Sequence, residues 1–298
     1  MKILLATDGS EYSKGAARFL RCLNLSAEDE ITIFHALYWI PFLYDRESYY
    51  GTLKEIKKDI APRIIDSVSE ILKPVNAKIS TAIIEGPPEE GVIDAAMVSG
   101  MDMIVMGARG IRGIETLFIG SVTRKVAIMS HKPVLVTKLP LSKNPEELKI
   151  LFATDGSDYA SATGEFLYKM PFHDNTKITI ANVMPSDFID IPATIVPEVI
   201  ERTIEIADKI RSMRFSASQR IVDQARDYLI KRFKNIEVLS ESGRPSTEIL
   251  KAAERLETDL IAVGCRGIRG IKGMMGSVSR NILTHSRCSV LIGKACKD

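Results

Sequence analysis

Lys2-Ile-Leu-Leu-Ala-Thr-Asp-Gly-Ser10 opens the chain, and Lys149-Ile-Leu-Phe-Ala-Thr-Asp-Gly-Ser157 repeats it 147 residues later. A second motif, Gly107-Ala-Arg-Gly-Ile-Arg-Gly-Ile114, returns as Gly264-Cys-Arg-Gly-Ile-Arg-Gly-Ile271. Two motifs that recur in the same order indicate a tandem duplication. The length of 298 residues suits two domains of ordinary size, and residues 141–147 have linker composition. We predict domains at 1–140 and 147–298.

Each copy alternates strand-like and helix-like segments. Its strands are short, continuous apolar runs, which are typical of parallel strands buried on both faces. The sequence therefore predicts an α/β protein of two doubly wound domains, each a five-stranded, mostly parallel sheet with helices on both faces. In the first copy we expect strands at 2–6, 30–36, 78–84, 103–106 and 134–136, and helices at 11–23, 53–72, 88–99 and 122–129. Pro62 predicts a kink or break, and the second copy has a longer helical region at about 196–233.

Composition excludes several classes of protein. Forty Lys and Arg against 38 Asp and Glu give a net charge of +2, which disfavours a nucleic-acid-backbone binder. No apolar run approaches the roughly 20 residues that span a bilayer. Asp8 comes too early for the apolar core of a signal peptide, so we expect a cytoplasmic protein without membrane attachment. Four cysteines without C-x-x-C spacing predict reduced thiols and no metal site: Cys22, Cys265, Cys288 and Cys296.

Doubly wound sheets bind ligands beyond the carboxyl ends of their strands, where the strand order reverses. In each copy, the loop after the first strand and the loop after the fourth strand reach that place. If the first and fourth strands are neighbours, these two loops face each other. Gly120-Ser121 precedes an apolar-periodic helix, whose free N–H groups and dipole favour phosphate. On the other wall, the Asp8 carboxylate suits a ribose hydroxyl or a metal-bound water. The alternatives are that Asp8 and Ser10 only cap the next helix, and that the glycines are only turn residues.

These residues resemble the universal stress protein family over both halves of the chain. The nucleotide-binding members carry G-x2-G-x9-G-[ST], which Gly107, Gly110, Gly120 and Ser121 match with nine residues between the last two glycines. The resemblance implies a Rossmann-like fold of the adenine nucleotide alpha hydrolase type. It also implies an adenosine site flanked by Thr7 and Asp8, with Ala36 at the adenine. Ribose and phosphates would then be held by Gly107, Gly110, Gly120, Ser121 and Val122.

The resemblance further implies ATP, ADP or AMP as the ligand, with or without Mg²⁺. By analogy with homodimers of the family, the two copies should pair through their fifth strands as a pseudo-dimer, and whole chains could pair again. The second copy departs from the motif because eight residues separate Gly267 from Gly276. Its site would comprise Thr154, Asp155, Val183, Gly264, Gly267, Gly276, Ser277 and Val278, with weaker phosphate contacts. Arg109 and Arg266 either neutralise phosphate or are solvated.

Signatures of other chemistry are missing from the sequence. It holds no G-x-x-x-x-G-K-[ST] and no G-x-S-x-G, and the four histidines have no histidine counterparts between copies. We therefore favour a stress-response binding protein that acts by ligand-dependent conformation or partner choice. The alternatives are a slow Mg²⁺-dependent ATPase or phosphotransferase using Asp8 and Asp155, and a scaffold with one working site. The aromatic segment 38–50 is either a lid or a partner-contact patch.

Overall fold

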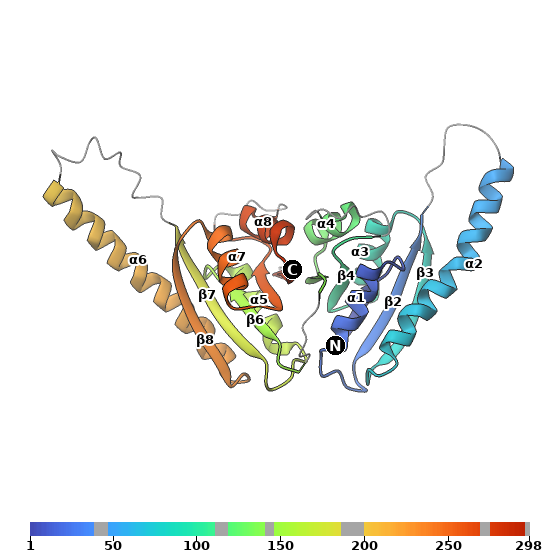
Figure 1. The fold of residues 1–298 in the computed structure, drawn as a ribbon, viewed down its shortest axis with the longest axis horizontal. Helices are drawn as coiled ribbons and strands as arrows, with labels where there is room; N and C mark the ends of the chain where they lie inside the picture. The colour runs from blue at the N-terminus through green and yellow to red at the C-terminus, as the bar shows by residue number, and fades with distance from the viewer. Residues whose placement is uncertain (39–46, 111–118, 141–145, 186–199, 269–274, 296–298) are drawn as a thin grey trace.

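The strands of both copies form one ten-stranded sheet in the order β3-β2-β1-β4-β5-β10-β9-β6-β7-β8 (Figure 1). The computed structural model describes residues 1–38, 47–110, 119–140, 146–185, 200–268 and 275–295. Within each domain all five strands are parallel. Domain 1 contains β1 (Lys2–Ala6), β2 (Glu30–Leu37), β3 (Lys78–Glu85), β4 (Met103–Gly107) and β5 (Val134–Thr137). Domain 2 contains β6 (Lys149–Ala153), β7 (Lys177–Pro185), β8 (Asn235–Gly243), β9 (Leu260–Gly264) and β10 (Ser289–Gly293).

Helices cover both faces of this sheet. Successive strand residues point to opposite faces, and in β1 the side chains of Ile3 and Leu5 enter one apolar cluster while Leu4 and Ala6 enter the other. The first cluster lies under α1 (Glu11–Leu20), α2 (Glu47–Leu72), α5 (Asp158–Lys169) and α6 (Ile200–Leu229). The second lies under α3 (Pro88–Val98), α4 (Ser121–Met129), α7 (Pro245–Arg255) and α8 (Ser277–His285). The doubly wound α/β fold predicted from the buried apolar strands is confirmed.

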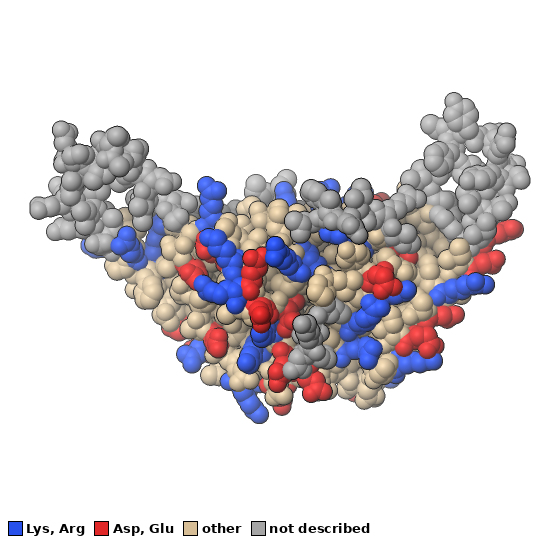
Figure 2. Space-filling view, in the orientation of Figure 1, with Lys and Arg blue, Asp and Glu red and all other residues tan. Residues whose placement is uncertain are grey.

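The molecular surface carries charges of both signs. On the face shown in Figure 2, Lys and Arg side chains are interspersed with Asp and Glu, in keeping with the net charge of +2. A search of the described helices finds none that combines the length and the apolar character needed to span a bilayer.

The element boundaries depart from the predictions at a few places. Helix α2 begins at Glu47, six residues before the predicted start, and it continues through Pro62 without a break. Proline removes one backbone N–H from the helix. The carbonyl of Lys58, four residues earlier, therefore receives no helix hydrogen bond from position 62. Lys58 lies on the exposed side of the helix, so water can hydrate this carbonyl. Helix α6 begins at Ile200 and ends at Leu229, inside the predicted range.

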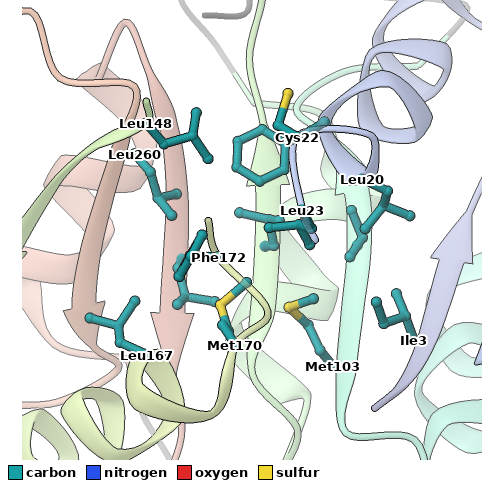
Figure 3. Packing of buried hydrophobic residues seen from close by; sticks show 14 of the residues in the cluster. Ile3, Leu20, Cys22, Leu23, Met103, Leu148, Leu167, Met170, Phe172 and Leu260 are labelled. Carbon is teal, nitrogen blue, oxygen red and sulfur yellow. The ribbon is translucent and has the colours of Figure 1, made fainter. Parts of the chain in front are cut away.

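The two domains meet through their fifth strands, as predicted. Strand β10 runs antiparallel to β5, with Leu291 opposite Leu135. Beside this junction, apolar side chains of both domains pack together, and Figure 3 shows Cys22 and Leu23 facing Met170 and Phe172. The domains therefore share one sheet and one core. The described cysteines Cys22, Cys265 and Cys288 are free thiols, while Cys296 and most of the aromatic segment 38–50 lie outside the described residues.

Candidate functional site

A cavity of about 410 Å³ opens beyond the carboxyl ends of β1 and β4 in domain 1. These strands are neighbours, with Leu5 beside Val105, so the loops that follow them face each other. All nine site residues predicted for this domain line the cavity: Thr7, Asp8, Ala36, Gly107, Arg109, Gly110, Gly120, Ser121 and Val122. Sequence reasoning missed seven further lining residues: Ala6, Ser13, Phe34, Pro88, Val92, Met106 and Thr123.

Three of the seven missed residues could have been found from strand alternation. Phe34 lies two positions before Ala36 and therefore points to the same face of β2, and Ala6 and Met106 are the last residues of that face in β1 and β4. Together with Val92 of α3, they make part of the cavity lining apolar. Such a lining suits a flat, weakly polar group like a nucleobase.

Glycine at position 107 brings two backbones together. A Cβ atom there would lie 2.5 Å from the carbonyl carbon of Tyr12, closer than any side chain can approach. The end of β4 therefore packs directly against the first turn of α1. Gly110 has a related role, since a Cβ at this position would collide with the Oδ2 atom of Asp8. The two loops consequently lie in contact, with the Asp8 carboxylate between them.

The amino end of α4 forms the opposite part of the cavity. Gly120 is its N-cap residue and supplies no side-chain hydrogen bond to the first N–H groups. Two contacts fix this end to β4: the Gly120 N–H donates to the Ala108 carbonyl at 2.9 Å, and the Thr123 hydroxyl donates to the Gly107 carbonyl at 2.9 Å. The first-turn N–H groups, which no preceding carbonyl can satisfy, lie where they can receive an anion.

Two polar side chains organise the strand-one loop. Ser10 caps α1, because its hydroxyl accepts from the Ser13 N–H at 3.2 Å. Asp8 accepts from the Ser10 N–H through Oδ1 at 3.0 Å and still lines the cavity. The capping interpretation therefore holds for Ser10, whereas Asp8 both supports the turn and faces the cavity. Behind it, the buried His35 ring binds the Thr7 carbonyl through Nδ1 at 2.8 Å, and because a carbonyl only accepts, Nδ1 carries the proton.

Arg109 lines the cavity while one end of its guanidinium is fixed. It donates to the Tyr12 hydroxyl at 2.9 Å, and its Cζ atom lies 5.3 Å from the centre of the Tyr12 ring. Arg266 of domain 2 repeats both contacts with Tyr159, at 2.7 Å and 5.0 Å. Each arginine is therefore held against a tyrosine while its side chain stays partly exposed.

Domain 2 reproduces the framework of the site on both sides of its shorter glycine loop. A Cβ at Gly264 would meet the Tyr159 carbonyl carbon at 2.8 Å, and one at Gly267 would collide with the Asp155 carboxylate. The Gly276 N–H donates to the Cys265 carbonyl at 2.8 Å. The Asp155 carboxylate also accepts from the Ile268 N–H at 3.0 Å.

The remaining predicted residues of domain 2 take corresponding places. Asn182 binds the Thr154 carbonyl at 2.7 Å, as His35 binds that of Thr7. Ser277 is the first residue of α8 and Val278 follows it, while Val183 lies in β7 at the position of Ala36 in β2. Among the described residues, no group of three or more His, Cys, Asp or Glu side chains could hold a metal ion.

Comparison with known proteins identifies the fold and its duplication. The sequence pattern of the universal stress protein family matches this chain twice, over residues 1–138 and over residues 148–294. The chain belongs to the universal stress protein family. Universal stress protein MJ0531 of Methanocaldococcus jannaschii is 32% identical over 143 residues, which are 47% of this chain and 82% of that protein. Universal stress protein MJ0577 of the same organism is 28% identical over 152 residues, or 46% of this chain and 94% of that protein.

A solved structure resembles the whole chain. A universal stress protein from Archaeoglobus fulgidus aligns with a TM-score of 0.65 and 20% identity, covering 99% of this chain and 98% of its own. That likeness shows that the fold of the whole chain, both halves included, recurs in another protein.

Proposed function

We propose that the protein is a stress-response protein that binds an adenine nucleotide (ATP, ADP or AMP) in each domain and acts through ligand-dependent conformation or partner binding. One observation carries this proposal. The nine residues that the sequence nominates in domain 1, although separated by up to 115 positions, line a single cavity. Its volume of about 410 Å³ falls within the range of small-molecule sites.

The lining of the cavity offers the kinds of chemical group that the parts of a nucleotide require. Phe34, Ala36 and Val92 offer apolar surface to the base. The Asp8 carboxylate accepts from ribose hydroxyls. The uncapped first turn of α4, with the Ser121 hydroxyl beside it, receives the phosphates, whose negative charge the helix dipole and Arg109 favour. Any Mg²⁺ would be carried by the phosphates, with Asp8 as the nearest carboxylate of the cavity lining.

The proposal extends to domain 2, for which we keep the boundaries 147–298, against 1–140 for domain 1. The contacts that hold the ends of its glycine loop equal those of domain 1. The first turn of α8 likewise lacks a side-chain cap from Gly276. We therefore expect a stoichiometry of two nucleotides per chain.

The nucleotide content of the purified protein tests this proposal. Denaturation followed by chromatography should release about two adenine nucleotides per chain. Ser121→Asp and Ser277→Asp should each lower this number to one, because an aspartate at the first helical position suits the helix but repels phosphate. Ser216→Asp places the same charge on the exposed side of α6 and should leave the content unchanged. Protein without nucleotide that also fails to bind ATP and AMP in titration would contradict the proposal.

A further inference from the structure

Two buried lysines cross the boundary between the domains in opposite directions. Lys138 directly follows β5, and its ammonium group donates to the carbonyls of Leu283 at 2.9 Å and Ser286 at 2.5 Å, at the carboxyl end of α8. Lys294 directly follows β10 and donates to the carbonyls of Ala127 at 2.8 Å and Ile128 at 3.3 Å, in the last turn of α4. Each domain therefore supplies a cation to a helix of the other.

The end of a helix is a suitable place for such a cation. The last carbonyls of a helix have no partner within it, and the helix dipole is negative there. Both lysines are only 9% exposed, so water cannot replace them. Burial opposes the charge and lowers the pKa of each ammonium group, to about 8 for Lys138. The carbonyls that each lysine binds supply the compensating partners.

The helices that receive these lysines are the two that begin at the proposed phosphate sites. Helix α4 runs only nine residues from Ser121 to Met129, and α8 runs nine residues from Ser277 to His285. Figure 1 shows both near the middle of the molecule. A phosphate at the amino end and the other domain's lysine at the carboxyl end thus act on opposite poles of one short helix.

The arginine of each site also acts electrostatically on the lysine of its own domain. A cavity of about 290 Å³ lies at the domain junction, lined by Arg109, Lys138 and Ser286 among others. Arg109 lines the nucleotide cavity as well. Its positive charge repels that of Lys138, and Arg266 acts in the same way on Lys294. Phosphate bound beside Arg109 would offset this repulsion.

We infer that Lys138 and Lys294 are positioning residues that act in trans, so that each nucleotide site is supported by the other domain and the two sites bind cooperatively. This inference rests on the proposed function and adds its regulation. Phosphate in domain 1 relieves the repulsion between Arg109 and Lys138, and the more stable cation strengthens α8 and hence the phosphate site of domain 2. The path through Arg266, Lys294 and α4 runs the opposite way, and binding linkage makes the coupling reciprocal.

Titration calorimetry with ATP at pH 7 tests this coupling one site at a time. In the Ser277→Asp background only domain 1 binds, and there Lys294→Met should weaken ATP binding about fivefold to tenfold. Lys138→Met in that background should weaken ATP binding less than Lys294→Met does, because it removes only the interaction of Lys138 with the domain 1 phosphate through Arg109. In the Ser121→Asp background the roles of the two lysines should be exchanged. Lys294→Arg, which keeps the cation, should restore most of the affinity of domain 1.

The parent chain supplies the test of cooperativity. It should bind two ATP molecules with the second tighter than the first, and the Lys138→Met/Lys294→Met double variant should bind them independently. Thermal melting of each variant near the parent value would show that the domains remain folded. Equal losses at both sites from one lysine variant, or no loss at either, would overturn the coupling while leaving nucleotide binding intact. A parent that binds no ATP would overturn the proposed function and the coupling together.

Discussion

The glycine loops of the two domains differ in length, yet their ends are held alike. Nine residues separate Gly110 from Gly120, and eight separate Gly267 from Gly276. On both sides of this difference the same contacts recur: glycine against the α1 or α5 backbone, glycine against the strand-one aspartate, and a hydroxyl from the helix to the end of the fourth strand. The position of the phosphate-facing helix is therefore set by strand-end contacts that both domains share.

A second difference between the domains is that large and small residues are exchanged at matching positions. Domain 1 places Thr137 at the end of β5 and Ala16 on α1, while domain 2 places Gly293 and Thr163 at the corresponding positions. Phe34 and Gly91 in domain 1 are likewise exchanged for Ala181 and Glu248. At the first pair, the Thr163 side chain of α5 occupies the space that a Cβ at position 293 of β10 would need.

The largest effect we expect comes from the glycine that ends the fourth strand. Gly107→Ala should lower the free energy of unfolding by about 3 kcal/mol or more, because its Cβ would lie 2.5 Å from backbone that cannot move away. Gly264→Ala should cost less, about 2 kcal/mol, since the nearest backbone atom is 2.8 Å away. Urea denaturation of both variants measures the difference, and a greater cost at Gly264 would contradict the prediction.

The buried lysines predict a pH dependence of stability. The folded state releases the Lys138 proton near pH 8, whereas the unfolded chain keeps it to about 10.5. Between these values the unfolded state binds more protons, so the unfolding free energy of the parent should rise with pH relative to Lys138→Met, by up to about 3 kcal/mol. The unfolding free energy of the parent should likewise rise with pH relative to Lys294→Met. A difference that stays constant from pH 7 to 10.5 would exclude this account.

The exchange of Thr137 and Gly293 can be tested by reversing it. Gly293→Ala should destabilise the protein by about 2 kcal/mol, because the added Cβ collides with the Thr163 side chain. Combining it with Thr163→Ala removes the colliding side chain, since α1 of domain 1 also has an alanine there, and should recover most of the loss. Thermal unfolding of the single and double variants measures this compensation, and additive losses would show that the two positions do not share one space.

The long helices provide a smaller comparison. Pro62 lies on the exposed side of α2, where α6 has Gln219 at the corresponding position. Pro62→Ala restores a helix N–H and removes a ring from the helix interior, gains that the greater freedom of the unfolded chain partly offsets. We expect about 1 kcal/mol of added stability in chemical denaturation. Gln219→Ala, at the matched position of α6, should change stability by less than about 0.5 kcal/mol.

The smallest effect on stability should come from replacing His35 by the residue that stands at its position in domain 2. His35→Asn should cost less than about 1 kcal/mol, because Asn182 binds the equivalent carbonyl at 2.7 Å. His35→Leu should cost more, since it leaves the buried Thr7 carbonyl without this donor. Equal losses in the two variants would show that packing, rather than the hydrogen bond, determines the residue here.

The strands and the first site could be predicted because their signals are local. Continuous apolar runs define strands to within a residue or two, and a motif attached to a strand end must lie at the edge of the sheet. The start of α2 could not be predicted in this way, since Glu-Ser-Tyr-Tyr-Gly-Thr at 47–52 has no apolar period. The contacts of Lys138 and Lys294 with the other domain could not be predicted from the sequence either. A lysine after a strand is ordinarily a surface residue, and only the docking of the second domain buries these two.

The antiparallel junction of β5 with β10 joins two halves of one polypeptide. Dilution cannot separate such halves, so their ratio stays one to one at any cellular abundance. A pair of identical subunits must also carry every substitution twice, once in each copy. Here a substitution such as His35 opposite Asn182 alters one side only. Fusion thus gives the molecule the architecture of a dimer together with the freedom to make its two halves unlike.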